Sequence, residues 1–215
     1  MKYYPAYLDL RERPCVVIGG GAVAERKAVA LLEAGASVTI ISPALTPKLH
    51  NLSESGKITY LNKQYEEKDL IGSFLVIAAT DSAEVNTRVA SACRKKHVLV
   101  NAATPPEESS FIVPSVVERG DLLIAISTSG TSPALAKKVR QDIEQRYGAE
   151  YELFLEKLSA IRKRVLEEIT DESRRRQVFQ AIVDSDVIDL IRQGKTHAAE
   201  LRMTEIAGLK HRHNI

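Results

Sequence analysis

The sequence predicts an α/β fold in which a Rossmann-like parallel sheet is followed by a mainly helical part. Short β-branched runs alternate with helical patterns over the first ~100 residues, as in a series of βα units. The predicted strands are apolar on both faces, which favours a parallel sheet covered by helices on both sides. From Ser132 onward the pattern is almost wholly helical. The 215 residues, of which 44% are hydrophobic, are enough for one domain or one and a half.

The elements of the first part follow from apolar runs and their stops. The first strand is a continuous apolar run that ends at three glycines. The helix after it has Ala28, Leu31 and Leu32 at helical spacing and stops at Gly35. A later helical pattern carries Pro47 in its first turn, and the fourth strand is apolar throughout. The expected strands are 15–18, 38–41, 58–61, 74–78 and 98–100, and the expected helices are 22–34, 43–55 and 83–96.

The second part begins with two apolar runs, 112–117 and 122–126, on either side of the turn signal Gly120-Asp121. This arrangement predicts a β-hairpin or a pair of edge strands. The domain boundary is expected near 113, with the mainly helical part from about 150. The expected helices are 132–147, 151–168, 172–185, 186–193 and 196–209.

Composition and charge exclude several classes of protein. The 30 basic and 28 acidic side chains leave a net charge of +2, which points to neither a nucleic-acid nor a membrane partner. No stretch approaches the ~20 apolar residues of a membrane helix, and no signal peptide is recognised. Cys15 and Cys93 are too few for a disulfide framework and are expected to be buried, free thiols in a reducing cytoplasm.

A glycine-rich turn after the first strand predicts dinucleotide binding. Its pattern is G-x-G-x-x-A, and it lies between a strong strand and a strong helix, as the motif requires. Gly19 permits the tight turn, Gly21 lets the backbone approach a pyrophosphate, and Ala24 allows close helix–strand packing. The N–H groups of Ala22 and Val23 would then point at the phosphates. The alternative is a glycine-rich turn in a Rossmann-like fold that binds no nucleotide.

The end of the second strand lacks the usual ribose carboxylate. Ser42 and Pro43 stand there, and Ser42 could bond a ribose hydroxyl, so the spacing alone does not choose between NAD and NADP. The loops after the fourth and fifth strands belong to the same edge of the sheet and add Thr80, Asp81 and Asn101 as candidates. Capping of the next helix by Asp81 or by the serine after it is the alternative for the first of these loops.

No metal site is expected from the sequence. His97 is placed between a helix and the fifth strand and is expected to be structural. His211 and His213 form an H-x-H pair near the chain end, where such a pair is more often incidental. His50 and His197 have no partner that the sequence identifies.

Four ordered motifs resemble one family. The run 16–27, with its Glu25-Arg26-Lys27 tail, resembles the signature of the siroheme synthase N-terminal module, a family of precorrin-2 dehydrogenases of which some also chelate iron. The runs 78–81, 110–115 and 129–133 agree with the family in order and spacing. The resemblance covers essentially the whole chain, including the helical tail.

The resemblance implies an organisation and a reaction. It implies an NAD-binding Rossmann domain over 1–113, a dimerisation segment over 114–150 and a small helical domain over 151–215, in a homodimer. It implies NAD contacts from the backbone of Ala22 and Val23 and near Pro43 and Ala44. The implied reaction is NAD-dependent dehydrogenation of precorrin-2 to sirohydrochlorin in siroheme biosynthesis.

One position departs from the family pattern Asn-x-x-Asp, which here reads Asn101-Ala102-Ala103-Thr104. The family aspartate is the candidate acid or base, and Thr104 cannot be a carboxylate base. Either water takes the proton, or Glu107, Glu108 or Asp81 replaces the aspartate. Base catalysis typically raises a reaction rate by ~10²–10⁴-fold, so losing the aspartate would slow the enzyme without abolishing its activity. A dehydrogenase therefore remains the leading interpretation. A bifunctional dehydrogenase–ferrochelatase and a non-catalytic NAD sensor are the alternatives.

The substrate that the resemblance implies carries several carboxylates. Basic side chains and helix N-termini are therefore candidates for binding it. Pro133 at the first position of a helix favours an anion site at that N-terminus. We therefore take Thr128, Ser129, Ser132 and Lys137 as candidate substrate residues, with plain helix capping as the alternative. The basic runs 162–164 and 174–176 are further candidates, although such runs usually lie on solvated helix faces.

Overall fold

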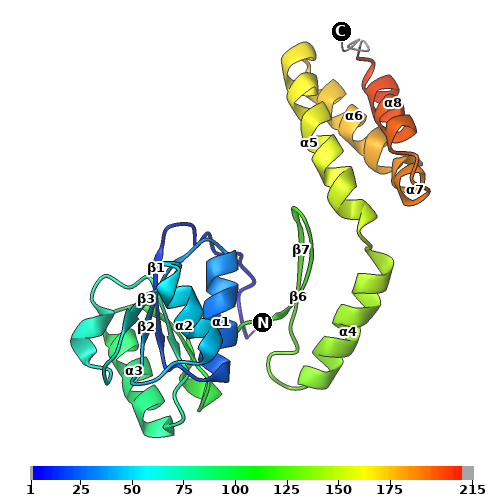
Figure 1. Cartoon of the computed structure of the whole chain (residues 1–215). Helices are drawn as coiled ribbons and strands as arrows, with labels where there is room; N and C mark the ends of the chain where they lie inside the picture. Colours follow the sequence, from blue (N-terminus) through cyan, green and yellow to red (C-terminus); the bar gives the residue numbers. More distant parts are fainter. Residues whose placement is uncertain (1, 210–215) are drawn as a thin grey trace. The chain divides into compact units, whose positions relative to one another are not determined.

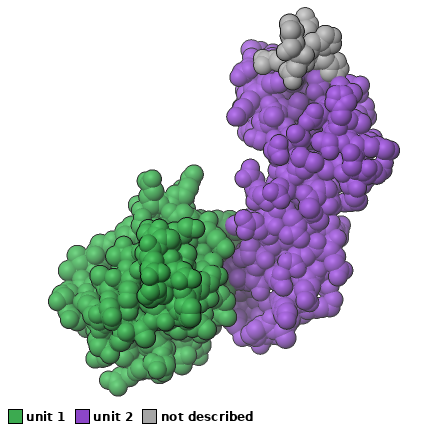
Figure 2. All heavy atoms as spheres, viewed as in Figure 1, with its two compact units in different colours: residues 1–113 green, residues 114–215 purple. Residues whose placement is uncertain are grey.

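The computed structural model describes residues 2–209 of the chain. The chain divides into two compact units, Met1–Val113 and Pro114–Ile215 (Figure 2). Each unit has a hydrophobic core of its own. The second predicted boundary, at 150, lies inside the second unit at the start of a helix, and it stays a prediction.

The first unit contains a five-stranded sheet in which every neighbouring pair is parallel. The strand order β3-β2-β1-β4-β5 is that of a doubly wound Rossmann-like fold, which confirms the predicted fold class. The strands are β1 (Pro14–Ile18), β2 (Ser37–Ile41), β3 (Thr59–Leu61), β4 (Leu75–Ala78) and β5 (Leu99–Ala102).

Helices cover both faces of this sheet, as the doubly apolar strands require (Figure 1). Cys15 and Val17 of β1 lie in the core shared with α1 (Ala22–Glu33) and α2 (Pro47–Glu54). Val16 and Ile18 lie in the core shared with α3 (Ala83–Lys95). Two short 3₁₀ turns, at Glu67–Leu70 and Pro106–Glu108, complete the unit.

The predicted helix 43–55 was wrong in its first turn. The helix begins only at Pro47, and Thr46 is its N-cap, with a hydroxyl that accepts a hydrogen bond from the Leu49 N–H at 3.3 Å. A residue before proline avoids helical backbone angles, and Thr46 has the extended values φ −65° and ψ 158°. Residues 43–46 are therefore free to form a loop at the end of β2.

The second unit contains an antiparallel hairpin and five helices. The hairpin begins at Ser115 rather than 112, and its first strand β6 (Ser115–Arg119) extends closer to the turn than predicted. The second strand β7 (Leu122–Ile126) has the predicted bounds. The helices α5 to α8 bury one common apolar core. The helices are α4 (Pro133–Arg146), α5 (Glu150–Glu168), α6 (Glu172–Val183), α7 (Val187–Arg192) and α8 (Thr196–Ala207). Among residues 2–209 no helix combines the length and apolar character needed to span a membrane.

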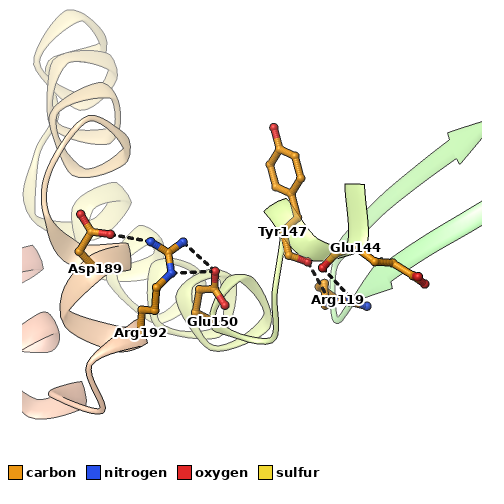
Figure 3. A network of polar contacts seen from close by, with 6 residues as sticks. All are labelled: Arg119, Glu144, Tyr147, Glu150, Asp189 and Arg192. Carbon is orange, nitrogen blue, oxygen red and sulfur yellow. Dashed lines mark hydrogen bonds and ion pairs between the residues drawn. The ribbon is translucent and has the colours of Figure 1, made fainter. Parts of the chain in front are cut away.

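Two arginines of the second unit connect its helices and hairpin through hydrogen bonds (Figure 3). Arg119 at the end of β6 donates from Nε to the Tyr147 carbonyl at 3.0 Å, beyond the last turn of α4. Arg192 of α7 bonds the Glu150 carboxylate at the start of α5 at 2.8 Å. Burial raises the pKa of the Glu150 carboxyl and is the largest single effect. The hydrogen bond and the charge of Arg192, together with backbone hydrogen bonds at the start of α5, outweigh it and lower that pKa. The hairpin thus holds the end of α4, and α7 holds the start of α5.

Candidate functional site

A cleft of about 670 Å³ opens at the carboxyl ends of β1 to β4, where open α/β sheets bind ligands. Four segments line it: the glycine loop after β1, the loop 42–46 after β2, residues 63–65 after β3, and the loop 79–82 after β4. The predicted residues that line it are Gly19, Gly21, Ser42, Pro43, Ala44, Thr80 and Asp81.

The three glycines of the loop have different reasons to be glycine. Gly19 has φ +119°, and a Cβ there would lie 2.3 Å from the Ala79 carbonyl oxygen. A Cβ on Gly20 would lie 1.9 Å from the Ala44 carbonyl oxygen, whereas a Cβ on Gly21 would meet no atom within 4 Å. Gly19 and Gly20 are therefore required by the packing of the protein itself, and Gly21 faces open space. Sequence reasoning missed Gly20, because the motif leaves its position unspecified.

The N-terminus of α1 is built to receive an anion. Gly21 is the N-cap and supplies no side-chain cap, while Ala22 and Val23 in the first turn are exposed. The N–H groups of a first helical turn have no partner inside the helix, and the helix dipole favours negative charge there. This open, backbone-lined cradle beside Gly21 fits a dinucleotide pyrophosphate.

The loop 42–46 is fixed against the glycine loop by hydrogen bonds. The Thr46 N–H donates to the Gly20 carbonyl at 3.0 Å, and the Thr46 hydroxyl donates to the Glu25 carboxylate at 2.5 Å. Tyr60 of β3 donates its hydroxyl to the Ser42 carbonyl at 3.0 Å. Glu25, which the sequence singled out only through the resemblance, thus joins α1 to the start of α2.

A buried amide shapes the loop after β4. Asn86 of α3 is fully buried, and its Nδ2 donates to the Thr80 carbonyl at 3.1 Å. Its Oδ1 accepts from the Thr80 N–H at 3.1 Å and from the Thr80 hydroxyl at 2.8 Å. Ser82, not Asp81, caps α3, by accepting from the Val85 N–H. Sequence reasoning missed Asn86, whose only signal is an amide on the apolar face of a helix.

Two further cleft residues, Tyr65 and Lys63, were also missed. Among the described residues, the Tyr65 hydroxyl is the buried side-chain polar atom that has no hydrogen-bond partner. Burial, followed by the effects of Cys93, Glu67 and Asp69, raises the pKa of Tyr65 to about 12, so the hydroxyl stays protonated. Tyr65 thus contributes to the cleft lining, while its hydroxyl is buried.

The residues near β5 lie apart from the cleft lining. Asn101 donates from Nδ2 to the Phe111 carbonyl at 3.1 Å, which holds the segment after the 3₁₀ turn. Thr104 and Glu107 are exposed, and Glu108 forms an ion pair with Arg94 of α3. Asp81 is the carboxylate that lines the cleft among the described residues. The roles of these residues stay predictions.

In the second unit the candidate substrate residues form a capped turn. Thr128 and Ser132 bond each other, with the Ser132 N–H donating to the Thr128 hydroxyl at 3.1 Å. The Ser132 hydroxyl then accepts from the Leu135 N–H as the N-cap of α4. Ser129 has φ +54°, and Lys137 is exposed. The capping alternative is therefore present in the structure, and substrate binding there stays a prediction.

The basic runs of the helices mostly have structural partners. Arg164 pairs with Glu168 and Arg176 with Glu172, both at the i,i+4 spacing. Arg175 donates from Nε to the Ile169 carbonyl at 2.6 Å. In the part of the chain that the structure describes, no group of three or more His, Cys, Asp or Glu side chains could hold a metal ion. The predicted H-x-H pair, His211 and His213, lies outside the described residues.

Family comparisons agree with this architecture. A family model described as "Putative NAD(P)-binding" matches residues 6–115. "Sirohaem biosynthesis protein central" matches 119–146, and "Sirohaem synthase dimerisation region" matches 150–206. The chain belongs to the siroheme synthase N-terminal family. The resemblance in the sequence is thereby confirmed, and so is the expectation of a nicotinamide dinucleotide cofactor.

The siroheme synthases to which the chain is similar are longer than the chain. It is 38% identical over 215 residues to a siroheme synthase of Methylobacillus flagellatus, which covers 98% of the chain and 46% of the relative. It is 37% identical over 209 residues to siroheme synthase 1 of Aeromonas salmonicida, covering 96% of the chain and 45% of the relative. The chain thus spans less than half the length of these relatives.

A solved structure of the family matches at full length. "SirC, precorrin-2 dehydrogenase" superposes with a TM-score of 0.80 at 27% identity, covering 94% of this chain and 100% of that chain. The segment described as the dimerisation region is 150–206, whereas the sequence placed the dimerisation segment at 114–150. The earlier placement stays a prediction.

Proposed function

We propose that this chain is an NAD-dependent precorrin-2 dehydrogenase, which oxidises precorrin-2 to sirohydrochlorin in siroheme biosynthesis. The observation that carries the proposal is the full-length likeness to a precorrin-2 dehydrogenase structure, in a chain whose cleft fits a dinucleotide. We propose further that it acts as a homodimer, since it contains a region described as a dimerisation region. We also propose a reducing cytoplasm as its location, which both free, buried cysteines suit.

The reaction removes a hydride and a proton from precorrin-2, and NAD⁺, when bound, accepts the hydride. The chain's own residues bind and orient. The first-turn amides of α1 beside Gly21 hold the pyrophosphate, and the Asn86-braced loop at Thr80 forms the wall after β4. The Thr128–Ser132 turn at the N-terminus of α4 is proposed to receive a substrate carboxylate.

We propose Asp81 as the group that takes the proton. It lines the cleft, whereas Glu108 is occupied by Arg94 and Thr104 has no carboxylate. Glu107 is exposed and does not line the cleft, which makes it a matched comparison. An Asp81→Asn variant should lose about 10²–10⁴-fold in turnover if Asp81 is the base, and Glu107→Gln should change turnover little. Equal turnover of Asp81→Asn and wild type would assign the proton to water.

The test of the function is a turnover assay without metal. Purified chain, precorrin-2 and NAD⁺ are mixed anaerobically, and NADH and sirohydrochlorin are followed by absorbance. Formation of both products at equal rates supports the proposal. Tight NAD⁺ binding without turnover refutes it and favours the second candidate, a non-catalytic NAD sensor, for which the absence of a carboxylate at Thr104 is the specific observation. Adding ferrous ion to the product mixture tests chelation in the same experiment.

A further inference from the structure

Glu25 carries a negative charge close to the N-terminus of α1. It is the acidic residue of the first turn of α1, and its N–H donates to the Gly21 carbonyl at 2.9 Å. A helical side chain leans toward the N-terminus of its helix, over the turn before its own Cα. The half-buried Glu25 side chain therefore starts about one turn from the open amides beside Gly21. An anion at a helix N-terminus is stabilised by the helix dipole, so this carboxylate and a bound pyrophosphate compete for the same position.

The Thr46 hydroxyl binds this carboxylate and directs it toward α2. The hydroxyl donates to Glu25 Oε2 at 2.5 Å, a short, charge-assisted hydrogen bond. A hydroxyl has a single hydrogen to donate, and here that hydrogen goes to Glu25. Thr46 is itself held in place, because its N–H donates to the Gly20 carbonyl and its carbonyl accepts from the His50 N–H, both at 3.0 Å. The carboxylate is thus bonded to the N-cap of α2.

Glu25 has no ion-pair partner within the described residues. Arg26 and Lys27 follow it on α1, but neither forms an ion pair with it. Lys27 instead has a lowered pKa, caused first by burial and then by the charge of Arg26. Because no cation in the described part of the chain pairs with the Glu25 carboxylate, the direction of its side chain decides how much negative charge faces the pyrophosphate site.

We propose that Thr46 is a positioning residue for dinucleotide binding, whose hydroxyl holds the Glu25 carboxylate away from the first-turn amides of α1. The amides are then left for the pyrophosphate. The inference rests on the proposed function, in that the cleft is taken as the dinucleotide site. Thr46 lines the cleft and Glu25 does not, so Glu25 acts on the dinucleotide through its charge rather than by contact.

The test is a double-variant cycle, measured by calorimetric titration of the whole chain with NAD⁺. Thr46→Val keeps the shape of the side chain and removes the hydroxyl, which frees the carboxylate. It should weaken NAD⁺ binding roughly 10-fold, because a unit charge ~7 Å away changes affinity by about 3–50-fold at effective dielectric constants of ~80 to ~20. Glu25→Gln, which still accepts from Thr46, should bind NAD⁺ at least as tightly as wild type. The double variant should bind within about 2-fold of wild type, because it has no charge left to control.

The rescue distinguishes positioning from a merely structural role. If Thr46 only supported the loop 42–46, the double variant would keep the loss seen in Thr46→Val, and that result overturns the inference. A loss below about 3-fold in Thr46→Val overturns it as well. High salt gives a second readout, since at ~1 M KCl the screening length is ~3 Å and the ratio of Thr46→Val to wild-type dissociation constants should approach one. A ratio that does not change with salt contradicts the electrostatic argument.

Two further variants complete the experiment. Thr46→Ser is the matched control, because it keeps the hydroxyl and the helix cap and should bind NAD⁺ as wild type does. Glu25→Asp leaves Thr46 intact but shortens the acid by one methylene, which breaks the 2.5 Å hydrogen bond and keeps the charge. It should weaken binding as Thr46→Val does, so the inference is tested even if Thr46→Val does not fold, and thermal melting reports the folding of every variant. Wild-type affinity in Glu25→Asp overturns the inference, whereas a wild-type chain that binds no NAD⁺ refutes the proposed function instead.

Discussion

Alanine substitutions at adjacent glycines of the loop should have opposite consequences. In Gly20→Ala the new Cβ would lie 1.9 Å from the Ala44 carbonyl oxygen and 3.0 Å from its carbon. A carbon–oxygen contact needs ~3.3 Å, so the loop 42–46 must move by more than about 1 Å. The movement strains the hydrogen bond from the Thr46 N–H to the Gly20 carbonyl. Overpacking of ~1–3 kcal/mol and a lost hydrogen bond of ~1 kcal/mol together predict a loss of about 2–4 kcal/mol.

Gly21→Ala should leave the protein folded and weaken its binding of NAD⁺. Its Cβ would meet no atom within 4 Å, and φ −85° with ψ −174° is extended backbone that alanine adopts. Since alanine is a poorer N-cap than glycine, the stability should fall by no more than about 1 kcal/mol, less than in Gly20→Ala. The same Cβ occupies the open space where the pyrophosphate approaches the α1 amides, and losing one or two charge-assisted hydrogen bonds predicts roughly 10–100-fold weaker NAD⁺ binding.

The assay pairs urea denaturation, followed by circular dichroism, with calorimetric titration of NAD⁺. Gly56→Ala is the control for instability alone, because Gly56 has φ +69° and nothing within 4 Å of a Cβ. It should cost about 1–2 kcal/mol and bind NAD⁺ normally. Wild-type affinity in Gly21→Ala, or wild-type stability in Gly20→Ala, would refute the division of roles between the two glycines.

Three further outcomes follow from buried and paired groups. Asn86→Ala should lose roughly 2–3 kcal/mol in urea denaturation and weaken NAD⁺ binding, because it removes the hydrogen bonds that the buried Asn86 amide makes to the half-buried Thr80. Asn51→Ala, on an exposed face of α2, should change little. Burial raises the pKa of both cysteine thiols to about 11, so a thiol reagent at pH 8 should label them only after unfolding, and rapid labelling of the native chain would contradict their burial. Arg192 lowers the pKa of Glu150, so the pair stabilises the fold above the ordinary carboxyl pKa, and this stabilisation is lost as the pH falls. Glu150→Gln should therefore lower the free energy of unfolding at pH 7 and make it depend less on pH in the acid range. An unchanged pH profile of stability would contradict this expectation.

Much of the first unit could be predicted because its signals are local. The doubly apolar strands determine a parallel sheet with helices on both faces, and the glycine loop between β1 and α1 marks the ligand-binding edge. The one clear error, the start of the helix at Pro47, also has a local cause, since a proline signals the first turn and not its middle. The proline at 47 therefore indicates the start of this helix better than the helical pattern of residues 43–46 does.

The residues that sequence reasoning missed depend on contacts between distant segments. Gly20 must be glycine because Ala44 lies against it, and Asn86 must be an amide because Thr80 lies against it. Neither requirement can be read from neighbouring residues, because each is set only when β2 and β4 take their places on either side of β1. Lys63 joins the cleft for the same reason, through the pairing of β3 with β2.

The chain departs from the expected patterns at two strand ends. Ser42 stands at the end of β2, where the dinucleotide-binding pattern has a carboxylate, and the N–H groups of Ser42 and Lys63 donate to the same carbonyl at the end of β3. Thr104 stands after β5, where the family pattern has an aspartate, and the fold leaves Asp81 as the carboxylate that lines the cleft among the described residues. A side chain lost at one strand end can be replaced from the neighbouring strand end, because all these strands present their carboxyl ends at one edge. The lining of the cleft therefore contains the cation Lys63 and the acid Asp81, although neither stands at the position that the motif assigns.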